Sequence, residues 1–369
     1  MAFTAFITGY PGFIGKRLVA RLAEANPRGR LIARVQPKQM DEAKRHAETI
    51  TGAALELVEG DVVDLHLGLA GAEYVGLVRE VSHVFHLAAI NSLTMPRELA
   101  RRVNVDGTRN VLELARECPS LERLVHFSTC YVSGTRLGVI AEDELEAGQS
   151  FRNAYEQTKY EAERLVERAK GELPITVVRP GTVVGDSRTG EVERFEGPYS
   201  IAMLLVLSPL VLPLPLPGNG VAPLNVVPVD FVVDATWALT QKPEAKGKTV
   251  HLVDPNPMSA RRVYELIAAR ANKRLPRFTL SARATDLFMR LPGVERVTRT
   301  QRSALGYVNH LAIYSSRTAL ELLEDTPVRC PPLTSYLDRL TDFALETWRA
   351  RRHEPGSGEF DDPLDRPMR

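Results

Sequence analysis

Short apolar runs alternate along the chain with segments whose apolar residues recur at helical spacing. Residues 3–8 are mostly apolar, as in a buried strand, and Ile14, Leu18 and Leu22 then recur every fourth residue, as on one face of a helix. Later runs predict strands at 31–35, 54–61, 81–89 and 121–134, and helices at 101–117 and from residue 153. This alternation predicts an α/β protein with a Rossmann-type doubly wound parallel sheet.

Three glycines punctuate the turn between the first predicted strand and its helix. Gly9 would permit a sharp turn, Gly12 would let the backbone approach a pyrophosphate, and Gly15 would allow close packing of the helix. The N-terminus of the helix offers unpaired N–H groups to an anion. Glycines also collect at ordinary strand-to-helix turns, so the spacing is not specific by itself. It predicts a dinucleotide phosphate site that other motifs must support.

The second predicted strand ends where a dinucleotide fold reads the adenosine ribose. No acidic residue stands there, whereas Arg34, Gln36 and Lys38 offer hydrogen-bond donors and positive charge. An Asp or Glu would repel a 2′-phosphate, and an Arg can accommodate one. We therefore expect NADP(H) in preference to NAD(H). The alternative is that Arg34 merely lies at a solvated strand end.

Small and acidic residues mark the ends of the next two strands. Asp61 follows the third strand, and Ala88 and Ala89 end the fourth. Because ligands of open parallel sheets bind at the carboxyl edge, we expect Asp61 to face the adenine and the alanines to lie along the cofactor. His86 is expected to be a packed strand residue rather than a base.

Composition excludes several classes of function. The chain has 47 Lys and Arg against 46 Asp and Glu, which argues against nucleic-acid binding and against an acidic disordered tail. Cys118, Cys130 and Cys330 are widely spaced and odd in number, and the N-terminus does not resemble a signal peptide. These features predict a cytoplasmic protein without a metal site.

A long uncharged segment lies between residues 197 and 229. Prolines at 209, 213, 215 and 217 interrupt it, so we expect no transmembrane span. Met203, Leu204 and Leu207 are instead predicted to line an apolar substrate site. Peripheral contact with a membrane is the alternative, since exposed apolar patches often mark such surfaces.

Tyr155 and Lys159 are four residues apart on a predicted helix and therefore share one of its faces. A nearby ammonium should lower the pKa of a phenol toward the working range of an acid or base. An isolated pair with this spacing is usually an ordinary surface pair. Here it follows Ser128 and Thr129 at a predicted strand end, which favours a catalytic role.

Together these motifs resemble the extended short-chain dehydrogenase/reductases, and within them the branch of fatty acyl-CoA reductases and thioester reductase domains. The motifs are the glycine turn at 8–15, Asp61, the Tyr155 and Lys159 pair, and the segments 127–132, 178–185 and 225–230. The resemblance covers roughly residues 3–255. It implies that Thr129 polarises a substrate carbonyl, that Tyr155 donates the proton, and that Lys159 also holds the nicotinamide ribose.

The resulting site prediction has three parts. The catalytic residues are Thr129, Tyr155 and Lys159. The cofactor residues are Thr8, Gly9, Tyr10, Pro11, Gly12, Phe13, Ile14, Gly15, Arg34, Gln36, Lys38, Asp61, Val62, Leu87, Ala88, Ala89, Asn104, Tyr155, Lys159, Pro180, Gly181, Thr182 and Val183. The substrate residues are Ser128, Cys130, Tyr131, Met203, Leu204 and Leu207.

The expected activity is hydride transfer from NADPH to the carbonyl of an apolar substrate, with an acyl thioester on coenzyme A or a carrier protein as the favoured class. The product would be an aldehyde or alcohol. Ketone or sterol-type dehydrogenation and sugar-nucleotide epimerisation are alternatives within the resemblance. A dinucleotide-sensing protein without turnover is a further one, although it would usually lack Tyr155 or Lys159.

Two parts of the chain are expected to build two functional regions. Residues 1–190 and 225–255 would form the dinucleotide-binding domain. Residues 191–224 and 256–351 would form a smaller, mainly helical substrate subdomain, with helices at 258–271, 283–291 and 332–351. Residues 352–369 would form a disordered tail. The sequence decides neither for nor against a homodimer.

Overall fold

A seven-stranded parallel sheet organises the chain in the computed structural model, which describes residues 3–92, 95–192, 220–270, 307 and 309–352. The strands stand in the order β10-β7-β5-β4-β1-β2-β3. Their bounds are β1 Thr4–Thr8, β2 Arg30–Val35, β3 Ala54–Glu59, β4 His83–His86, β5 Arg123–Phe127, β7 Ile175–Pro180 and β10 Thr249–Leu252. The order reverses between β1 and β4, and ligands of such sheets bind in the crevice at that point.

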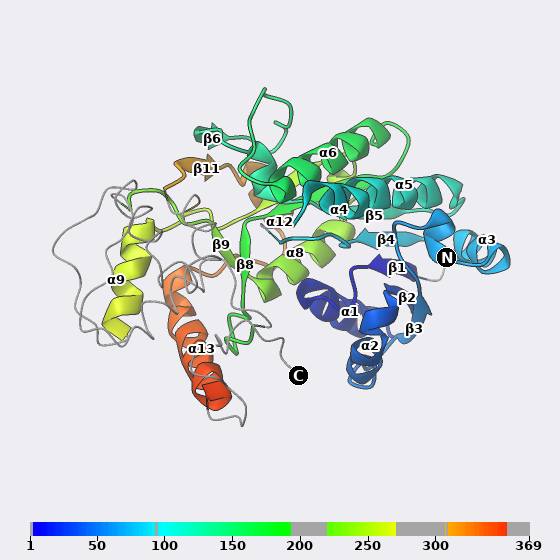
Figure 1. Cartoon of the computed structure of the whole chain (residues 1–369), viewed down its shortest axis with the longest axis horizontal. Coiled ribbons are helices and arrows are strands. Elements are labelled where there is room, and N and C mark those ends of the chain that lie inside the picture. Colours follow the sequence, from blue (N-terminus) through cyan, green and yellow to red (C-terminus); the bar gives the residue numbers. More distant parts are fainter. Residues whose placement is uncertain (1–2, 93–94, 193–219, 271–306, 308, 353–369) are drawn as a thin grey trace.

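Helices cover both faces of this sheet (Figure 1). One face carries α1 Phe13–Ala25, α2 Met40–Ala47, α8 Val229–Thr240 and α12 Arg317–Leu323. The other carries α3 Gly71–Glu80, α5 Gly107–Glu117 and α6 Ala154–Ala169. Each helix buries an apolar stripe, such as Leu18 and Leu22 of α1, which are fully buried against the sheet. The predicted Rossmann-type fold is therefore confirmed.

A smaller unit lies beyond the carboxyl edge of the sheet (Figure 1). It contains α9 Ala260–Arg270 and α13 Leu337–Arg352, which pack together around Ile267, Tyr336 and Leu340. Two short parallel pairs stand outside the central sheet: β8 Thr182–Val184 with β9 Val226–Pro228, and β6 Gly138–Ile140 with β11 Ala312–Tyr314.

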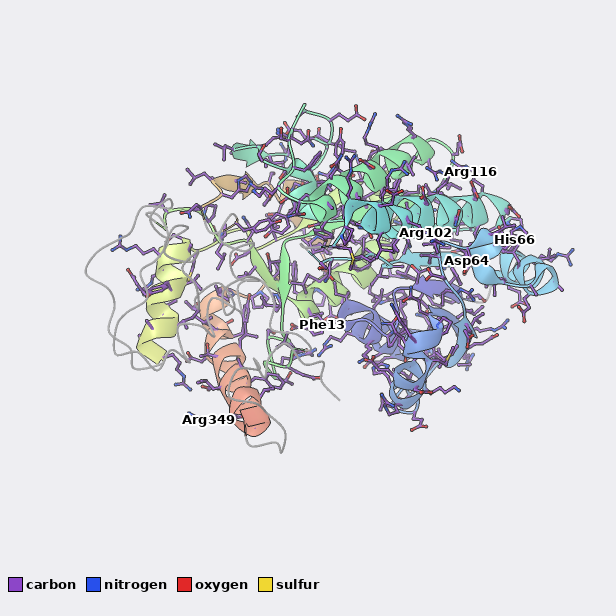
Figure 2. The ribbon with its side chains drawn as sticks, viewed as in Figure 1. Phe13, Asp64, His66, Arg102, Arg116 and Arg349 are labelled. Atoms are coloured by element: carbon purple, nitrogen blue, oxygen red, sulfur yellow. The ribbon has the colours of Figure 1, made fainter. Side chains whose placement is uncertain are left out.

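Phe13 joins the two units, because its ring packs against both the sheet core and the cluster formed by α9 and α13. Figure 2 shows this side chain at the start of α1, on the side that faces α13, whereas Arg349 lies near the far end of α13. The start of α1 therefore stands where the two units meet.

The structure corrects several predicted boundaries. The helix predicted at 101–117 consists of α4 Arg97–Arg101, a π-helical turn Arg102–Asp106 and α5. The strand predicted at 121–134 ends at Phe127, and a 3₁₀ turn follows at Cys130–Ser133. The remaining 3₁₀ turns are Pro37–Gln39, Leu65–Gly68, Pro243–Ala245 and Leu333–Ser335.

Of the predicted helices of the smaller unit, the first begins at its expected Ser259 cap and the last begins later than expected. The Ser259 hydroxyl accepts a hydrogen bond from the Arg262 amide at 3.2 Å and so caps α9, which begins at Ala260. The helix predicted from residue 332 begins only at Leu337, because a 3₁₀ turn precedes it. The helix predicted at 283–291 and the tail from 353 lie outside the described residues. None of the helices in the described part of the chain combines the length and apolar character that crossing a membrane requires.

Candidate active site

The turn after β1 has the geometry of a phosphate cradle. Gly9 has φ +83°, and a Cβ there would lie 2.7 Å from the Leu87 carbonyl carbon. A Cβ on Gly15 would lie 2.5 Å from the Gly9 oxygen, so only glycine lets α1 approach the turn this closely. Gly12 precedes α1 without a side-chain cap, and the first turn of α1 has no acidic residue. The open N–H groups and the absence of negative charge fit the diphosphate of a nicotinamide dinucleotide.

The residues expected to read the adenosine ribose are arranged differently from the prediction. The Arg34 side chain is 3% exposed, and its guanidinium donates to the carbonyls of Glu59 and Leu67. The alternative of a solvated strand end is therefore wrong. Gln36 donates to the Asp61 carboxylate at 2.6 Å, so these two side chains act together. Lys38 is exposed and lines the cavity.

Two predicted cofactor residues do not line the cavity but hydrogen-bond to its wall from the protein interior. The Thr8 hydroxyl accepts from the amides of Leu87 and Ala88, each at 3.2 Å. The Asn104 amide accepts from the Ile90 amide at 2.7 Å and donates to the Thr158 hydroxyl at 2.9 Å. Both are buried and neither lines the cavity, because their hydrogen bonds point into the protein. They fix the loop after β4 to β1 and α6.

His86 is a packed strand residue, as expected. Its ring nitrogens hydrogen-bond with the hydroxyls of Thr8 at 2.8 Å and Thr108 at 2.9 Å. Burial lowers its pKa to about 3, so it remains neutral at neutral pH.

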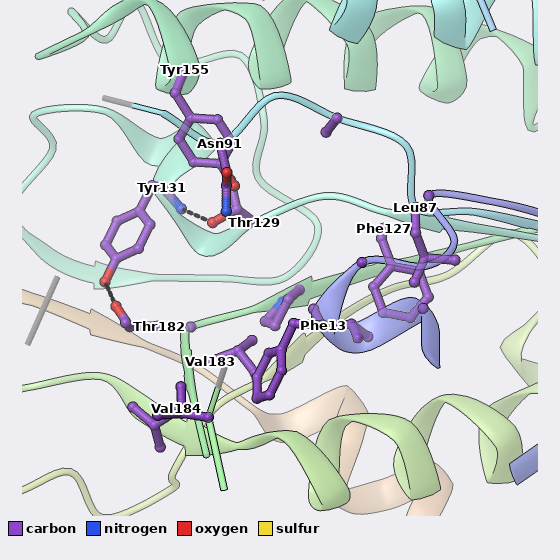
Figure 3. A pocket seen from close by; sticks show the side chains of 18 of the residues that line it. Phe13, Leu87, Asn91, Phe127, Thr129, Tyr131, Tyr155, Thr182, Val183 and Val184 are labelled. Carbon is purple, nitrogen blue, oxygen red and sulfur yellow. Dashed lines mark hydrogen bonds between the residues drawn. The ribbon is translucent and has the colours of Figure 1, made fainter. Parts of the chain in front are cut away.

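Thr129, Tyr155 and Lys159 meet at the carboxyl end of β5. Figure 3 shows the Tyr155 ring extending from α6 toward Thr129, so the two hydroxyl groups face each other. Lys159 is 3% exposed, and its ammonium donates to the Phe127 carbonyl at 2.6 Å. One face of α6 therefore presents both side chains to the strand end, as four-residue spacing requires.

The titration of this pair differs from the expectation. Burial raises the pKa of Tyr155 to about 12, and the neighbouring Thr129 hydroxyl offsets this only in part. Burial also lowers the pKa of Lys159 to about 8, although Glu163 opposes the shift. The prediction that the ammonium brings the phenol toward neutral pH is therefore wrong for the protein alone, because burial raises the pKa of Tyr155 and the Lys159 ammonium is engaged by the Phe127 carbonyl.

A buried ion pair lies next to Ser128, the residue before Thr129. Arg179 and Glu163 lie 2.5 Å apart with side chains 2% and 0% exposed. The neighbouring Ser128 hydroxyl donates to the same carboxylate. Ser128, predicted as a substrate residue, lines the cavity, but its hydroxyl proton is engaged by Glu163.

The other predicted substrate residues separate into different environments. The Tyr131 hydroxyl lies 2.5 Å from the Thr182 hydroxyl, and its ring faces the cavity. Cys130 does not line the cavity: its thiol donates to the Arg179 carbonyl at 3.1 Å within an apolar cluster that includes Tyr314. The 3₁₀ turn rotates it away from its neighbours. Met203, Leu204 and Leu207 lie outside the described residues.

All these elements surround one cavity of about 680 Å³. Apart from Thr8 and Asn104, every predicted cofactor residue lines it. The glycine turn and the group Thr129, Tyr155 and Lys159 stand on one side. On the other side, α9 and α13 form an apolar wall from Val263, Ile267, Leu337 and Leu340.

Several residues that line the cavity were not predicted from the sequence. Asn91 and Ile90 follow β4, and Tyr307 and His310 precede β11. The helical spacing of apolar residues predicted α9 and α13, but it did not indicate which face of each helix would line the cavity. Asn91 could have been found from its position just beyond a strand end, whereas Tyr307 and His310 come from a distant segment.

Comparison with known proteins identifies the family. The model of the family described as Male sterility protein, an NAD-binding family, matches residues 7–236. The chain belongs to this family. The match covers the glycine turn, the strands β2, β3, β4, β5 and β7 of the sheet, and the group Thr129, Tyr155 and Lys159. The chain has the extended short-chain dehydrogenase/reductase fold.

Two curated relatives illustrate the range of the family. Fatty acyl-CoA reductase wat of Drosophila melanogaster is 26% identical over 63% of this chain and 53% of its own length. Aldehyde reductase lnaA of Aspergillus flavus is 29% identical over 68% of this chain and 26% of its own length. The chain thus spans about half or less of these relatives.

A solved structure matches nearly the whole chain. The terminal R domain from the myxalamid PKS-NRPS biosynthetic pathway is 27% identical, with a TM-score of 0.81, over 94% of this chain and 91% of that one. The similarity therefore includes the smaller unit that faces the cofactor side of the cavity.

Proposed function

We propose that the protein is an NADPH-dependent reductase of acyl thioesters. The observation that carries the proposal is the placement of the Thr129 and Tyr155 hydroxyls in one cavity with a glycine turn and a wall of apolar side chains from α9 and α13. Such a wall suits an acyl chain, whereas a nucleotide-sugar would need charged and amide groups. The relatives named above support the same chemistry.

The chain's own residues would act on the carbonyl oxygen. When bound, the nicotinamide supplies a hydride to the carbonyl carbon. Tyr155 donates its phenolic proton to the carbonyl oxygen as that oxygen gains charge, and Thr129 stabilises the same oxygen by a hydrogen bond. A pKa raised to about 12 keeps the phenol protonated at neutral pH, which is the form that a reductase requires.

The reaction then releases an aldehyde and a thiol. Hydride and proton addition convert the thioester to a hemithioacetal. Collapse of its carbon–sulfur bond gives an aldehyde and a free thiol, and a second hydride and proton would give the alcohol. Lys159 would hold the nicotinamide ribose, and its buried ammonium stands one helical turn from Tyr155.

The NADPH preference now depends chiefly on Lys38. The Arg34 guanidinium is already engaged by two backbone carbonyls, whereas the exposed Lys38 ammonium lines the cavity at the end of β2. A cation here would favour a 2′-phosphate on the ribose, and Gln36 and Asp61 would contact the adenosine.

A substrate panel tests the proposed reaction. The purified protein is incubated with NADPH and an acyl-CoA series, a ketosteroid or a sugar nucleotide, while nicotinamide oxidation and free thiol are followed. We expect thiol release together with NADPH oxidation on long acyl-CoAs. Oxidation with the ketosteroid and none with any acyl thioester would support the ketone alternative instead.

A further inference from the structure

His310 is a buried residue of the cavity wall, and its second ring nitrogen bonds to none of the described residues. The residue is 6% exposed and lines the cavity. Its Nε2 atom has no hydrogen-bond partner within the described part of the chain. Leaving a buried polar group unsatisfied is costly, so such an atom in a binding cavity calls for an explanation.

Arg152 determines which form of the imidazole is present. Its guanidinium lies 2.6 Å from the His310 Nδ1 atom. An arginine can only donate, so Nδ1 must accept, and in the neutral ring the proton is then on Nε2. Burial and the Arg152 charge lower the pKa of His310 to about 4, so the ring is neutral at neutral pH.

A network of hydrogen bonds holds Arg152 at the start of α6, the helix that carries Tyr155. Arg152 also donates to Glu156 at 3.1 Å and to the Gly134 carbonyl at 2.7 Å. The Glu156 carboxylate, which is fully buried, accepts from the Tyr307 hydroxyl at 2.7 Å. Glu156 directly follows Tyr155 on α6, so the network connects the His310 ring to the helix that carries the proton donor.

The same network places His310 on the substrate side of the cavity. The Tyr307 ring packs edge-on against Tyr131, with centroids 4.7 Å apart. Tyr131 in turn bonds Thr182 close to Thr129. The adenosine end, at Lys38 and Asp61, is built by different segments, those that follow β2 and β3.

We propose that the Nε2–H group of His310 donates a hydrogen bond to an oxygen on the acyl group of the substrate. The preferred substrates would therefore be acyl thioesters whose chain carries a hydroxyl or carbonyl oxygen, rather than plain hydrocarbon chains. This inference rests on the proposed function, because it specifies the substrate class of the same site.

Two conservative replacements separate this role from a structural one. His310→Asn puts an amide oxygen near the position of Nδ1, so it retains an acceptor for Arg152 but lacks the donor that reaches the cavity. His310→Gln puts an amide N–H near the position of Nε2 and retains that donor. If His310 only holds Arg152, the His310→Asn variant should behave more like the parent than the His310→Gln variant does. If His310 binds the substrate, the His310→Gln variant should be the more parent-like of the two.

The test compares an unsubstituted acyl-CoA with its positional hydroxyacyl-CoA isomers of equal chain length, using NADPH. We expect the parent protein to prefer at least one isomer in kcat/KM by about 3- to 10-fold, the contribution of one neutral hydrogen bond. His310→Asn should abolish that preference and His310→Gln should retain it, with NADPH affinity unchanged as a check of folding.

The outcomes are distinguishable. If the parent shows no preference among these thioesters, or if Asn retains the preference and Gln loses it, the inference is overturned while thioester reduction stands. If the parent protein reduces none of them, the proposed function itself fails.

Discussion

The choice between the two nicotinamide cofactors depends on which cation faces the adenosine ribose. Arg34 had the expected position in the sequence, but its burial and its two carbonyl partners could not be seen there. β2 lies inside the sheet, so even its last residues are enclosed by Glu59 and Leu67 of the next elements. Lys38 stands beyond the strand end and remains exposed.

Replacement of Lys38 by Ala should therefore reduce the preference for NADPH. An exposed cation beside a phosphate contributes modestly, so we expect about a 3- to 10-fold weaker affinity for NADPH and little change for NADH. Fluorescence titration of both cofactors measures this. Lys44→Ala, an exposed lysine of α2 that does not line the cavity, is the matched control. Equal losses for both cofactors would show that Lys38 does not contact the 2′-phosphate.

The elements follow from the sequence more closely than individual contacts do. Each predicted strand of the sheet appears. The inner strands are mostly apolar, as buried parallel strands usually are, whereas the edge strand β3 consists of exposed and half-buried residues. The π-helical turn Arg102–Asp106 was not predictable, since the apolar period continues through it. Cys130 was misplaced because no residue pattern indicated that the 3₁₀ turn after β5 would rotate it away from Thr129 and Tyr131.

At the glycine turn, a single added methyl group should disrupt both packing and binding. Gly15→Ala would place Cβ 2.5 Å from the Gly9 oxygen and 3.3 Å from the Tyr10 Cα, and the backbone there has little room to move. We expect a loss of about 1–3 kcal/mol in the free energy of unfolding, together with weaker cofactor binding. Urea denaturation and cofactor titration measure the two effects.

The control for this variant is Gly76→Ala in α3. No heavy atom lies within 4 Å of its Cβ position, so the added methyl group should stabilise the helix by about 0.5–1 kcal/mol. If Gly15→Ala were as harmless as Gly76→Ala, the close approach of α1 to the turn would not be needed for the fold or the site.

The wall formed by α13 should set the length of the acyl chain. Ala344 is 2% exposed and lines the cavity, so Ala344→Leu would fill space that an acyl chain needs. We expect the ratio of kcat/KM for long over short acyl-CoAs to fall by at least about tenfold. Glu346→Leu, at an exposed position of the same helix, should leave the ratio unchanged. An unchanged ratio in Ala344→Leu would place the chain elsewhere.

Across the whole molecule, the two units meet at residues that are far apart in the sequence. The Tyr307 hydroxyl contacts Glu156 from 151 positions away, and local periodicity carries no information on such pairs. This is why the glycine turn, the catalytic pair and the sheet could be predicted, whereas the side of the cavity formed by Tyr307 and His310 could not.

Buried histidines should make the whole fold sensitive to acid. Burial lowers the pKa of His83 to about 4, of His86 to about 3 and of His251 to about 3. The unfolded chain takes up protons below about pH 6.5, where the folded protein does not, so stability must fall as pH decreases from there. His86 alone would contribute up to about 2 kcal/mol between pH 6.5 and 5.

Urea denaturation at a series of pH values measures this slope. His86→Gln should reduce it, since glutamine does not titrate. A free energy of unfolding that stays constant from pH 7 to 5 would mean that these imidazoles gain protons in the folded protein, contrary to their surroundings.

Single-turnover reduction by Tyr155→Phe measures whether Tyr155 donates the proton to the thioester carbonyl. The substitution removes only the hydroxyl, so the ring should still pack beside Thr129 and NADPH should bind with nearly the parent affinity. Thiol release from an acyl-CoA should slow by about 10²- to 10⁴-fold, the usual contribution of general acid catalysis. Thiol release at the parent rate would contradict the assignment of Tyr155.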